Sequence, residues 1–296
     1  MEIGRLLTAM ITPFHENGDV NYEMASKLAK AIVDSGSDGL VIGGTTGEAP
    51  TISDDEKLKL FSVIKESIGT DHALIAGTTN NNTKESIKLS KLAESENVDG
   101  LLLTVPSYNK PTQEGLYQHF KAISEEVSIP CILYNVPSRT SLNMDDETTV
   151  KLSELKNIIG IKEASNDLDQ ITRIINNTSA DFKVWSGNDN ETLYIMAAGG
   201  YGIVSVAGHI VSRQINQMIG YLLEGNIELA GKEHRRLLEL FNIIFVVTNP
   251  IPIRYYVKKS GFDIGSPRLP MTEADSKTKS ILDESIKKYS VDLKFN

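Results

Sequence analysis

Short apolar runs alternate with longer amphipathic stretches along most of the chain. Near-continuous apolar runs of this length are typical of strands that are buried on both faces of a parallel sheet. The amphipathic stretches between them, such as 24–33 and 84–93, have apolar positions at the spacing of helices. The predicted strands are Leu6–Ile11, Gly39–Ile42, Ala73–Ala76, Gly100–Val105, Cys131–Asn135, Ile158–Ile161, Phe182–Trp185 and Ile203–Val206.

Two local signals mark where predicted helices begin. The stretch Ser53-Asp54-Asp55-Glu56 has the pattern of a capping box, and Thr112 precedes Gln113-Glu114 in a similar way. About eight strand–helix repeats, roughly 20–35 residues apart, are the rhythm of an eight-stranded parallel barrel. A doubly wound open sheet shares the same elements, but the number of repeats favours an α/β fold of the (β/α)8 TIM-barrel type.

The strand pattern mostly stops beyond Gly225. Residues 227–244 and 273–289 have helical spacing, and we place the apolar run Phe245-Val246-Val247 in a helix or at its end. We therefore predict a barrel over residues 1–225 that carries the active site, followed by a helical extension over residues 226–296 that packs on it. A barrel of this size is usual for the fold, which often occupies about 250 residues.

The composition limits the binding partners and the cellular compartment that we expect for this protein. The 296 residues include 30 Lys and Arg against 39 Asp and Glu, a net charge of −9 that argues against nucleic acid or an anionic membrane surface. The single cysteine, Cys131, lies in an apolar run and cannot form an intrachain disulfide, which fits a reducing cytosol. No apolar stretch approaches the roughly 18 residues of a membrane helix, and residues 1–5 lack a signal pattern. We expect a cytoplasmic protein.

The ends of the predicted strands are where chemistry is expected, because barrels of this type carry their active sites there. Lys162 interrupts an apolar run where the sixth strand should end. A lysine in low-dielectric surroundings has a lowered pKa, and its neutral amine is a nucleophile toward carbonyls. An ion pair with Glu163 is the alternative, although adjacent residues of a strand point to opposite faces. Schiff-base chemistry and a structural role both remain open on these grounds.

Other strand ends carry groups suited to anions. The loop Gly43–Glu48 offers backbone N–H groups and hydroxyls to a carboxylate or phosphate, although a structural turn explains it equally well. Arg139, in the loop after the fifth strand, is a natural bidentate carboxylate clamp. Tyr108 and Tyr134 lie next to prolines, where a buried tyrosine is usually part of the core. The histidines have no metal-ligand spacing, so we predict no metal site.

Together these motifs resemble the pyruvate-dependent class I aldolases, a family that includes N-acetylneuraminate lyase and is typified by dihydrodipicolinate synthase. The resemblance covers nearly the whole chain. Related sugar-acid lyases share the lysine and the glycine-rich loop but usually lack an arginine at the position of Arg139, which favours the synthase. The most specific matching segments are Gly43–Glu48, Tyr108–Tyr117, Tyr134–Thr140 and Gly160–Ala164.

The resemblance implies a reaction and a role for each matching residue. Pyruvate would form a Schiff base with Lys162, lose a methyl proton and attack L-aspartate-4-semialdehyde, on the diaminopimelate route to lysine, with no metal or organic cofactor. A proton relay would contain Tyr134, Thr45 and Tyr108, the last reaching into a neighbouring subunit of a homotetramer built from tight dimers. The implied substrate-binding residues are Thr46 and Val204 for the pyruvate carboxylate, Arg139 for the aldehyde's carboxylate, and Gly187.

The sequence also leaves open how the protein is regulated and whether it has one of two rival functions. Members of the family that lysine inhibits often have a tyrosine and histidines where this chain has Ser107, Asp54 and Lys57, although Asn81 and Glu85 match the lysine ligands. We therefore expect weak or absent feedback by lysine. One rival is a lyase for a sugar acid, such as an N-acetylneuraminate or 2-keto-3-deoxy acid aldolase. The other is a barrel that senses a small carboxylate without catalysis.

Overall fold

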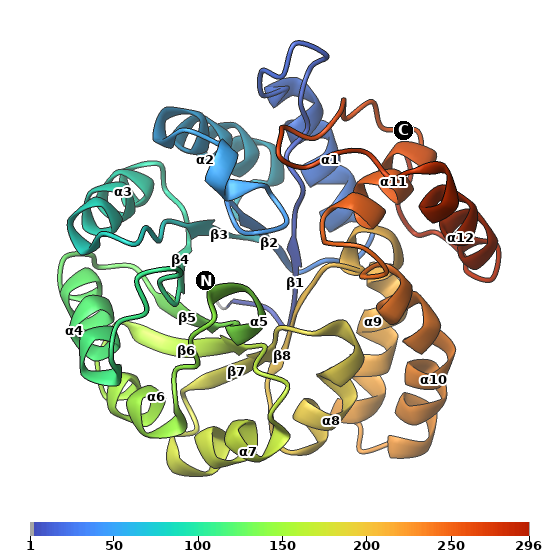
Figure 1. Cartoon of the computed structure of the whole chain (residues 1–296). Helices are drawn as coiled ribbons and strands as arrows, with labels where there is room; N and C mark the ends of the chain where they lie inside the picture. Colours follow the sequence, from blue (N-terminus) through green and yellow to red (C-terminus); the bar gives the residue numbers. More distant parts are fainter. Residues whose placement is uncertain (1–2, 296) are drawn as a thin grey trace.

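The computed structural model describes residues 3–295 and arranges them around a closed barrel of parallel strands (Figure 1). Strand order follows the sequence, and pairing of the last strand with the first closes the barrel. The predicted TIM barrel is therefore confirmed, and the open sheet is excluded. The strands are β1 (Leu6–Ala9), β2 (Gly39–Ile42), β3 (Ala73–Gly77), β4 (Gly100–Thr104), β5 (Cys131–Asn135), β6 (Ile158–Glu163), β7 (Lys183–Ser186) and β8 (Gly202–Ser205).

Helices form a ring around the strands, and the last three lie along one side of this ring in Figure 1. Two short 3₁₀ helices, η1 (Ala49–Thr51) and η2 (Asp189–Glu191), follow strands β2 and β7. The α-helices are α1 (Tyr22–Asp34), α2 (Asp54–Ile68), α3 (Thr83–Ser95), α4 (Gln113–Ser124), α5 (Pro137–Thr140), α6 (Asp146–Ser153), α7 (Leu168–Asn177), α8 (Thr192–Ala197), α9 (Gly208–Leu223), α10 (Ile227–Ile243), α11 (Ile251–Lys259) and α12 (Ser276–Ile286).

The strands bury side chains on both faces, as their apolar composition predicts. Successive side chains of a strand point to opposite faces, so one set fills the barrel and the other packs against the helices. In β1, for example, Leu7 belongs to the inner cluster and Leu6 to the outer one. Cys131 is fully buried in the outer cluster, where burial raises the pKa of its thiol to about 12. This environment suits a small hydrophobe, not a reactive thiol.

The helix starts agree with the sequence signals. Ser53 and Glu56 form the predicted capping box, and the Thr112 hydroxyl accepts a hydrogen bond from the backbone N–H of Gly115. The run Phe245-Val246-Val247 lies in the turn region after α10, so of the two placements that we expected, the end of a helix agrees with the structure. The sequence patterns did not predict α11, because its apolar residues do not belong to a longer stretch with helical spacing. No helix within residues 3–295 combines the length and hydropathy needed to cross a membrane.

A buried ion pair fastens the C-terminal part of the chain to the loop after β2. Arg254, in α11, donates to the Glu48 carboxylate at 2.9 Å and also to the carbonyls of Thr12, Ile264 and Gly265. Both side chains are almost completely buried. Burial raises the pKa of Glu48, and the positive charges of Arg254 and Arg268 oppose that rise. The ionised Glu48 carboxylate therefore depends on the Arg254 guanidinium to compensate for the hydration that it loses on burial.

Replacement of this arginine is expected to destabilise the fold strongly. In Arg254→Met, Glu48 stays buried without its cation, and such a loss typically costs about 3–5 kcal/mol of the free energy of unfolding. Urea unfolding followed by circular dichroism measures the loss. Arg254→Lys is the matched control, because it keeps the charge but not the forked donors, and an intermediate loss is expected. A loss below about 1 kcal/mol in Arg254→Met would show that the pair carries little stability.

Candidate active site

Lys162 lies at the carboxyl end of β6 and points into the barrel. In the sheet it stands beside Tyr134 of β5 and Trp185 of β7, and both neighbours belong to the inner cluster. Its side chain is only 6% exposed. The Lys162 Nζ lies over the Tyr134 ring, 4.2 Å from the ring centroid. The apolar run that predicts a buried strand therefore also places an amine in the barrel interior.

This environment changes the protonation of the lysine. Burial lowers the pKa of Lys162 to about 7, because the charged form loses its hydration; the nearby Asp189 carboxylate opposes this, and the Arg139 charge adds to it. A substantial fraction of the side chain is consequently a neutral amine near neutral pH. An amine with a lowered pKa in a buried site is suited to attack a carbonyl carbon.

The neighbouring Glu163 faces the other way. In the sheet it stands beside Asn135, and its carboxylate accepts hydrogen bonds from that side chain, from the backbone of Ser165 and from Gln170 of α7. These partners lie on the helix side of β6. The alternative of an ion pair between Lys162 and Glu163 is therefore wrong, for the reason given by strand alternation.

Tyr134 completes the pair inside the barrel. Burial raises the pKa of its hydroxyl to about 12; the Arg139 charge opposes the rise and the Glu163 charge adds to it. The phenol therefore stays protonated near neutral pH, next to an amine that titrates there. A neutral hydroxyl beside a neutral amine can pass protons to and from a group that forms between them.

The glycine-rich loop after β2 borders the barrel mouth. Thr45 lines a cavity there, while the Thr46 side chain is buried and its hydroxyl accepts a hydrogen bond from the Asn249 amide at 2.8 Å. Because the amide donates, the Thr46 hydroxyl can direct its own proton to another acceptor. This loop also contains Glu48, whose pairing with Arg254 anchors it.

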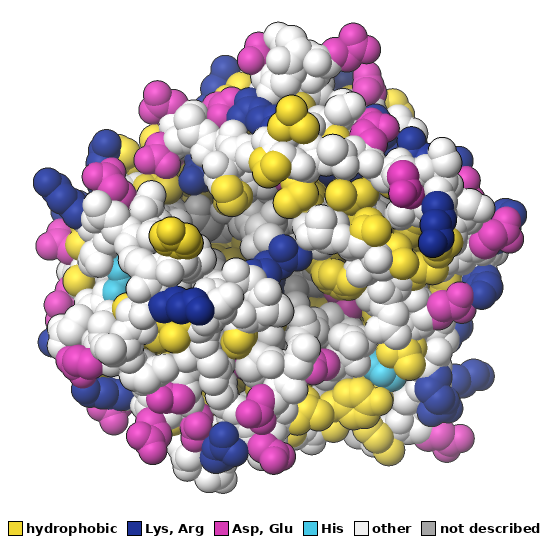
Figure 2. Space-filling model, in the orientation of Figure 1, with side chains coloured by type: hydrophobic (Ala, Val, Ile, Leu, Met, Phe, Trp, Pro, Cys, Tyr) yellow, Lys and Arg dark blue, Asp and Glu magenta, His cyan; other side chains and the backbone are white. Residues whose placement is uncertain are grey.

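A cavity of about 380 Å³ opens between the loops that follow β2, β3, β4 and β5. The helix α5, directly after β5, lies across the front of the barrel in Figure 1, and Figure 2 shows a hollow near the middle of this face. Val136 lies both in the inner cluster and in the wall of the cavity, so the cavity adjoins the barrel interior near Tyr134. Its wall includes Gly44, Thr45, Thr79, Thr104, Val136, Arg139, Asn249, Pro250, Pro270 and Met271.

Three other predicted residues have different surroundings. Val204 is buried in β8 inside the barrel, in register with Leu7 of β1. The backbone N–H of Gly187 donates to the carbonyl of Glu163, so in this structure that N–H extends the hydrogen bonding between β6 and β7. Tyr108 is 92% exposed, with a positive φ of 67°, on the loop after β4. The chain therefore brings Lys162 and Tyr134 together but leaves Tyr108 on the outer surface.

Two polar residues of the site were not predicted. Asp189 is buried after β7 and accepts hydrogen bonds from the Ser205 hydroxyl and from the backbone N–H groups of Val206 and Ala207. It follows a strand end, so the rule that led to Lys162 could have found it. Asn249 lies in the C-terminal part of the chain, which the sequence prediction left outside the site, and no sequence signal marks it.

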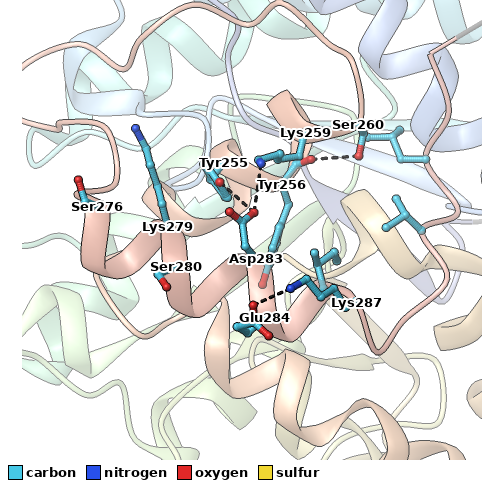
Figure 3. A pocket seen from close by; sticks show the side chains of 13 residues that line it. Tyr255, Tyr256, Lys259, Ser260, Ser276, Lys279, Ser280, Asp283, Glu284 and Lys287 are labelled. Carbon is cyan, nitrogen blue, oxygen red and sulfur yellow. Dashed lines mark hydrogen bonds and ion pairs between the residues drawn. The ribbon is translucent and has the colours of Figure 1, made fainter.

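A larger cavity, of about 1000 Å³, lies between α11 and α12, away from these residues (Figure 3). Several of its polar side chains pair with one another: Asp283 accepts from Tyr255 at 2.9 Å and contacts Lys259 at 3.2 Å, as the dashed lines in Figure 3 show. None of the predicted site residues lines it. Within residues 3–295, no three His, Cys, Asp or Glu side chains are grouped as a metal site would require.

Comparison with known proteins identifies relatives over almost the full length. A protein from Dehalococcoides mccartyi named 4-hydroxy-tetrahydrodipicolinate synthase is 53% identical over 292 residues, which is 99% of this chain and 98% of the relative. A protein of the same name from Moorella thermoacetica is 48% identical over 287 residues, covering 97% of this chain and 98% of the relative.

Solved structures agree with these sequence relatives. The dihydrodipicolinate synthase of Cyanidioschyzon merolae, solved with lysine bound, matches with a TM-score of 0.95 at 40% identity, over 97% of this chain and 98% of that one. The dihydrodipicolinate synthase of Aquifex aeolicus matches with a TM-score of 0.95 at 39% identity, over 99% and 100%. Residues 2–289 match the model of the dihydrodipicolinate synthetase family, and the chain belongs to that family.

Proposed function

We propose that this chain condenses pyruvate with L-aspartate-4-semialdehyde through a Schiff base on Lys162, as a 4-hydroxy-tetrahydrodipicolinate synthase of the lyase class. The observation that carries the proposal is the buried Lys162 amine, with a pKa lowered to about 7, beside the Tyr134 hydroxyl. Full-length relatives at 53% and 48% identity bear the name of this enzyme, which supports the choice of reaction.

Lys162 starts the reaction as a nucleophile. Its neutral amine attacks the ketone carbon of pyruvate, and loss of water gives an imine. The imine withdraws electrons from the adjacent methyl group, which loses a proton to become an enamine. The enamine carbon then forms a bond to the aldehyde carbon of the second substrate, and cyclisation releases the product from Lys162. The reaction needs no metal or organic cofactor, because the imine is itself the electron sink.

Hydroxyl groups move the protons. Tyr134 accepts and returns protons during imine formation and the later steps, in a relay with Thr45 and Tyr108. The high pKa of Tyr134 keeps its proton in place until a basic group forms beside it. Positioned acid–base groups contribute typically about 10²–10⁴-fold to a rate, so the relay accelerates a reaction that Lys162 makes possible.

The carboxylates of the two substrates are bound by different groups. Thr46, whose hydroxyl proton is left free by the Asn249 contact, binds the pyruvate carboxylate together with the backbone near Val204 and Gly187. Arg139 lies in the cavity wall and binds the carboxylate of the aldehyde substrate. Since the whole chain carries a charge of −9, binding of anionic substrates depends on these local donors.

The relay needs a second copy of the chain. Tyr108 is 92% exposed and lies on an outward loop, which supports its insertion into the site of a neighbouring subunit. A homotetramer built from two such dimers completes the assembly, and we place it in the cytoplasm, where the single Cys131 remains reduced.

The identity of the aldehyde substrate is the sharpest test of the reaction. With pyruvate saturating, turnover with L-aspartate-4-semialdehyde is expected to exceed turnover with N-acetylmannosamine or D-glyceraldehyde, the aldehydes of sugar-acid lyases. In Arg139→Ala, the KM for the semialdehyde should rise about 10–100-fold with little change in the KM for pyruvate, because a charge-assisted contact is lost. Arg139→Lys is the control, and its KM for the semialdehyde should lie between that of the wild type and that of Arg139→Ala. Faster turnover of a sugar aldehyde would favour a sugar-acid lyase.

Lysine is expected to inhibit the enzyme weakly or not at all. Asn81 and Glu85 match lysine ligands of the family, but Ser107 replaces a tyrosine, and Lys57 forms an ion pair with Asp54 at 3.7 Å where histidines are usual. A cationic side chain at this place disfavours a cationic ligand. Initial rates with and without millimolar L-lysine measure the effect. Loss of most of the activity at that concentration would contradict the expectation.

A further inference from the structure

A buried carboxylate lies among amide groups on the helix-facing side of β6, the strand that carries Lys162. Glu163 is fully buried, and both of its oxygens are 3.2 Å from the side-chain nitrogen of Asn135. The backbone N–H of Ser165 donates to it at 2.8 Å, and the Gln170 amide donates at 3.4 Å. Each of these partners is a donor, which is the arrangement that an ionised carboxylate requires. Burial nevertheless raises the pKa of Glu163 to about 7, so the ionised form depends on these donors.

This contact joins the two strands that carry Lys162 and Tyr134. Asn135 faces Glu163 in the sheet, one position beyond the point where Tyr134 faces Lys162. Because neighbouring residues of a strand point to opposite faces, the outer pair and the inner pair share two short pieces of backbone. Any rotation or slip that breaks the outer pair therefore also moves the amine relative to the phenol.

The same network holds the end of the segment that carries Arg139. The side-chain Oδ1 of Asn135 accepts from the backbone N–H of Met144 at 3.0 Å, and its side-chain nitrogen donates to the Asn143 side chain at 2.8 Å. The Gln170 amide exchanges hydrogen bonds with Asn143 and donates to the Met144 carbonyl at 3.2 Å. The segment from Val136 to Met144, which includes α5, is thus fixed at both ends by Asn135.

We propose that Glu163 and Asn135 are positioning residues, whose buried carboxylate–amide contact sets the placement of Lys162 against Tyr134 and of the loop that bears Arg139. This inference rests on the proposed Schiff-base function and adds to it two residues that touch no substrate. A purely structural role would affect the stability of the fold only. A positioning role also affects the rate at which correctly folded molecules form the imine, because small misplacements of reacting groups are costly.

Glu163→Gln is the direct test. The amide keeps one acceptor but turns the other oxygen into a donor that faces the donors of Asn135 and Gln170. We expect the initial rate of imine formation with pyruvate, measured by quenching with borohydride at timed intervals, to fall about 10–100-fold per folded molecule. The final amount of adduct per folded molecule and the KM for pyruvate should change by less than about threefold, since the nucleophile and carboxylate site remain.

The matched control weakens the other end of the same strand. Asn157 precedes β6 and donates to the carbonyls of Ser124 and Val127. Asn157→Ala should lower the melting temperature while its folded molecules form the imine at the wild-type rate. If Glu163→Gln lowers the melting temperature and also forms the imine at the wild-type rate, Glu163 is structural only and the inference is overturned.

Two further variants cover the case in which Glu163→Gln does not fold. Gln170→Met removes the amide that bonds Glu163, Asn143 and Met144, with little change of volume, and should slow imine formation about twofold to tenfold, because these hydrogen bonds are lost together. The double variant Asn135→Asp with Glu163→Gln restores a carboxylate–amide pair in reverse and should recover about threefold or more of the rate lost in Asn135→Asp alone. Wild-type rates in Gln170→Met, or no recovery in the double variant, contradict the inference. Absence of any adduct in the wild type contradicts the proposed function instead.

Discussion

The chemistry that we propose for this chain depends on the burial of one amine inside a closed barrel. Pairing of β8 with β1 closes the sheet around a buried interior, and parallel register brings the Lys162 side chain over the Tyr134 ring. The loss of hydration lowers the pKa of the amine to about 7 while the nearby Asp189 carboxylate limits the shift. The barrel thus provides both the position of the proposed nucleophile and its neutral form.

The two faces of the strands have separate tasks. Inside the barrel, the apolar side chains of the inner cluster lie beside Lys162 and bury its amine. Outside, Glu163 and the amides around it link β6 to β5 and to the loop after β5. The C-terminal part of the chain adds a third element, because Arg254 holds Glu48 and Asn249 contacts Thr46. The loop after β2 is therefore anchored by residues that are about 200 positions away in the sequence.

Sequence patterns predicted the barrel, the place of Lys162 at a strand end and the divergence of Glu163, because strand periodicity depends on local order alone. They missed Asn249 and the Glu48–Arg254 pair, since contacts between distant segments leave no periodic signal, and they missed α11, whose apolar residues do not belong to a longer periodic stretch. The resemblance to the aldolases supplied roles for Thr46 and Tyr108 that no spacing rule contains. The structure of one chain leaves Tyr108 exposed, so the role that we propose for it depends on the assembly and not on the fold of one chain.

Covalent trapping of the imine tests the central claim most directly. The protein is incubated with pyruvate, reduced with borohydride and digested, and the added mass is located by peptide mapping. The account predicts one adduct on Lys162, formed faster as the pH rises through about 7, because only the deprotonated amine reacts. An unmodified Lys162, or an adduct confined to another lysine, would contradict it.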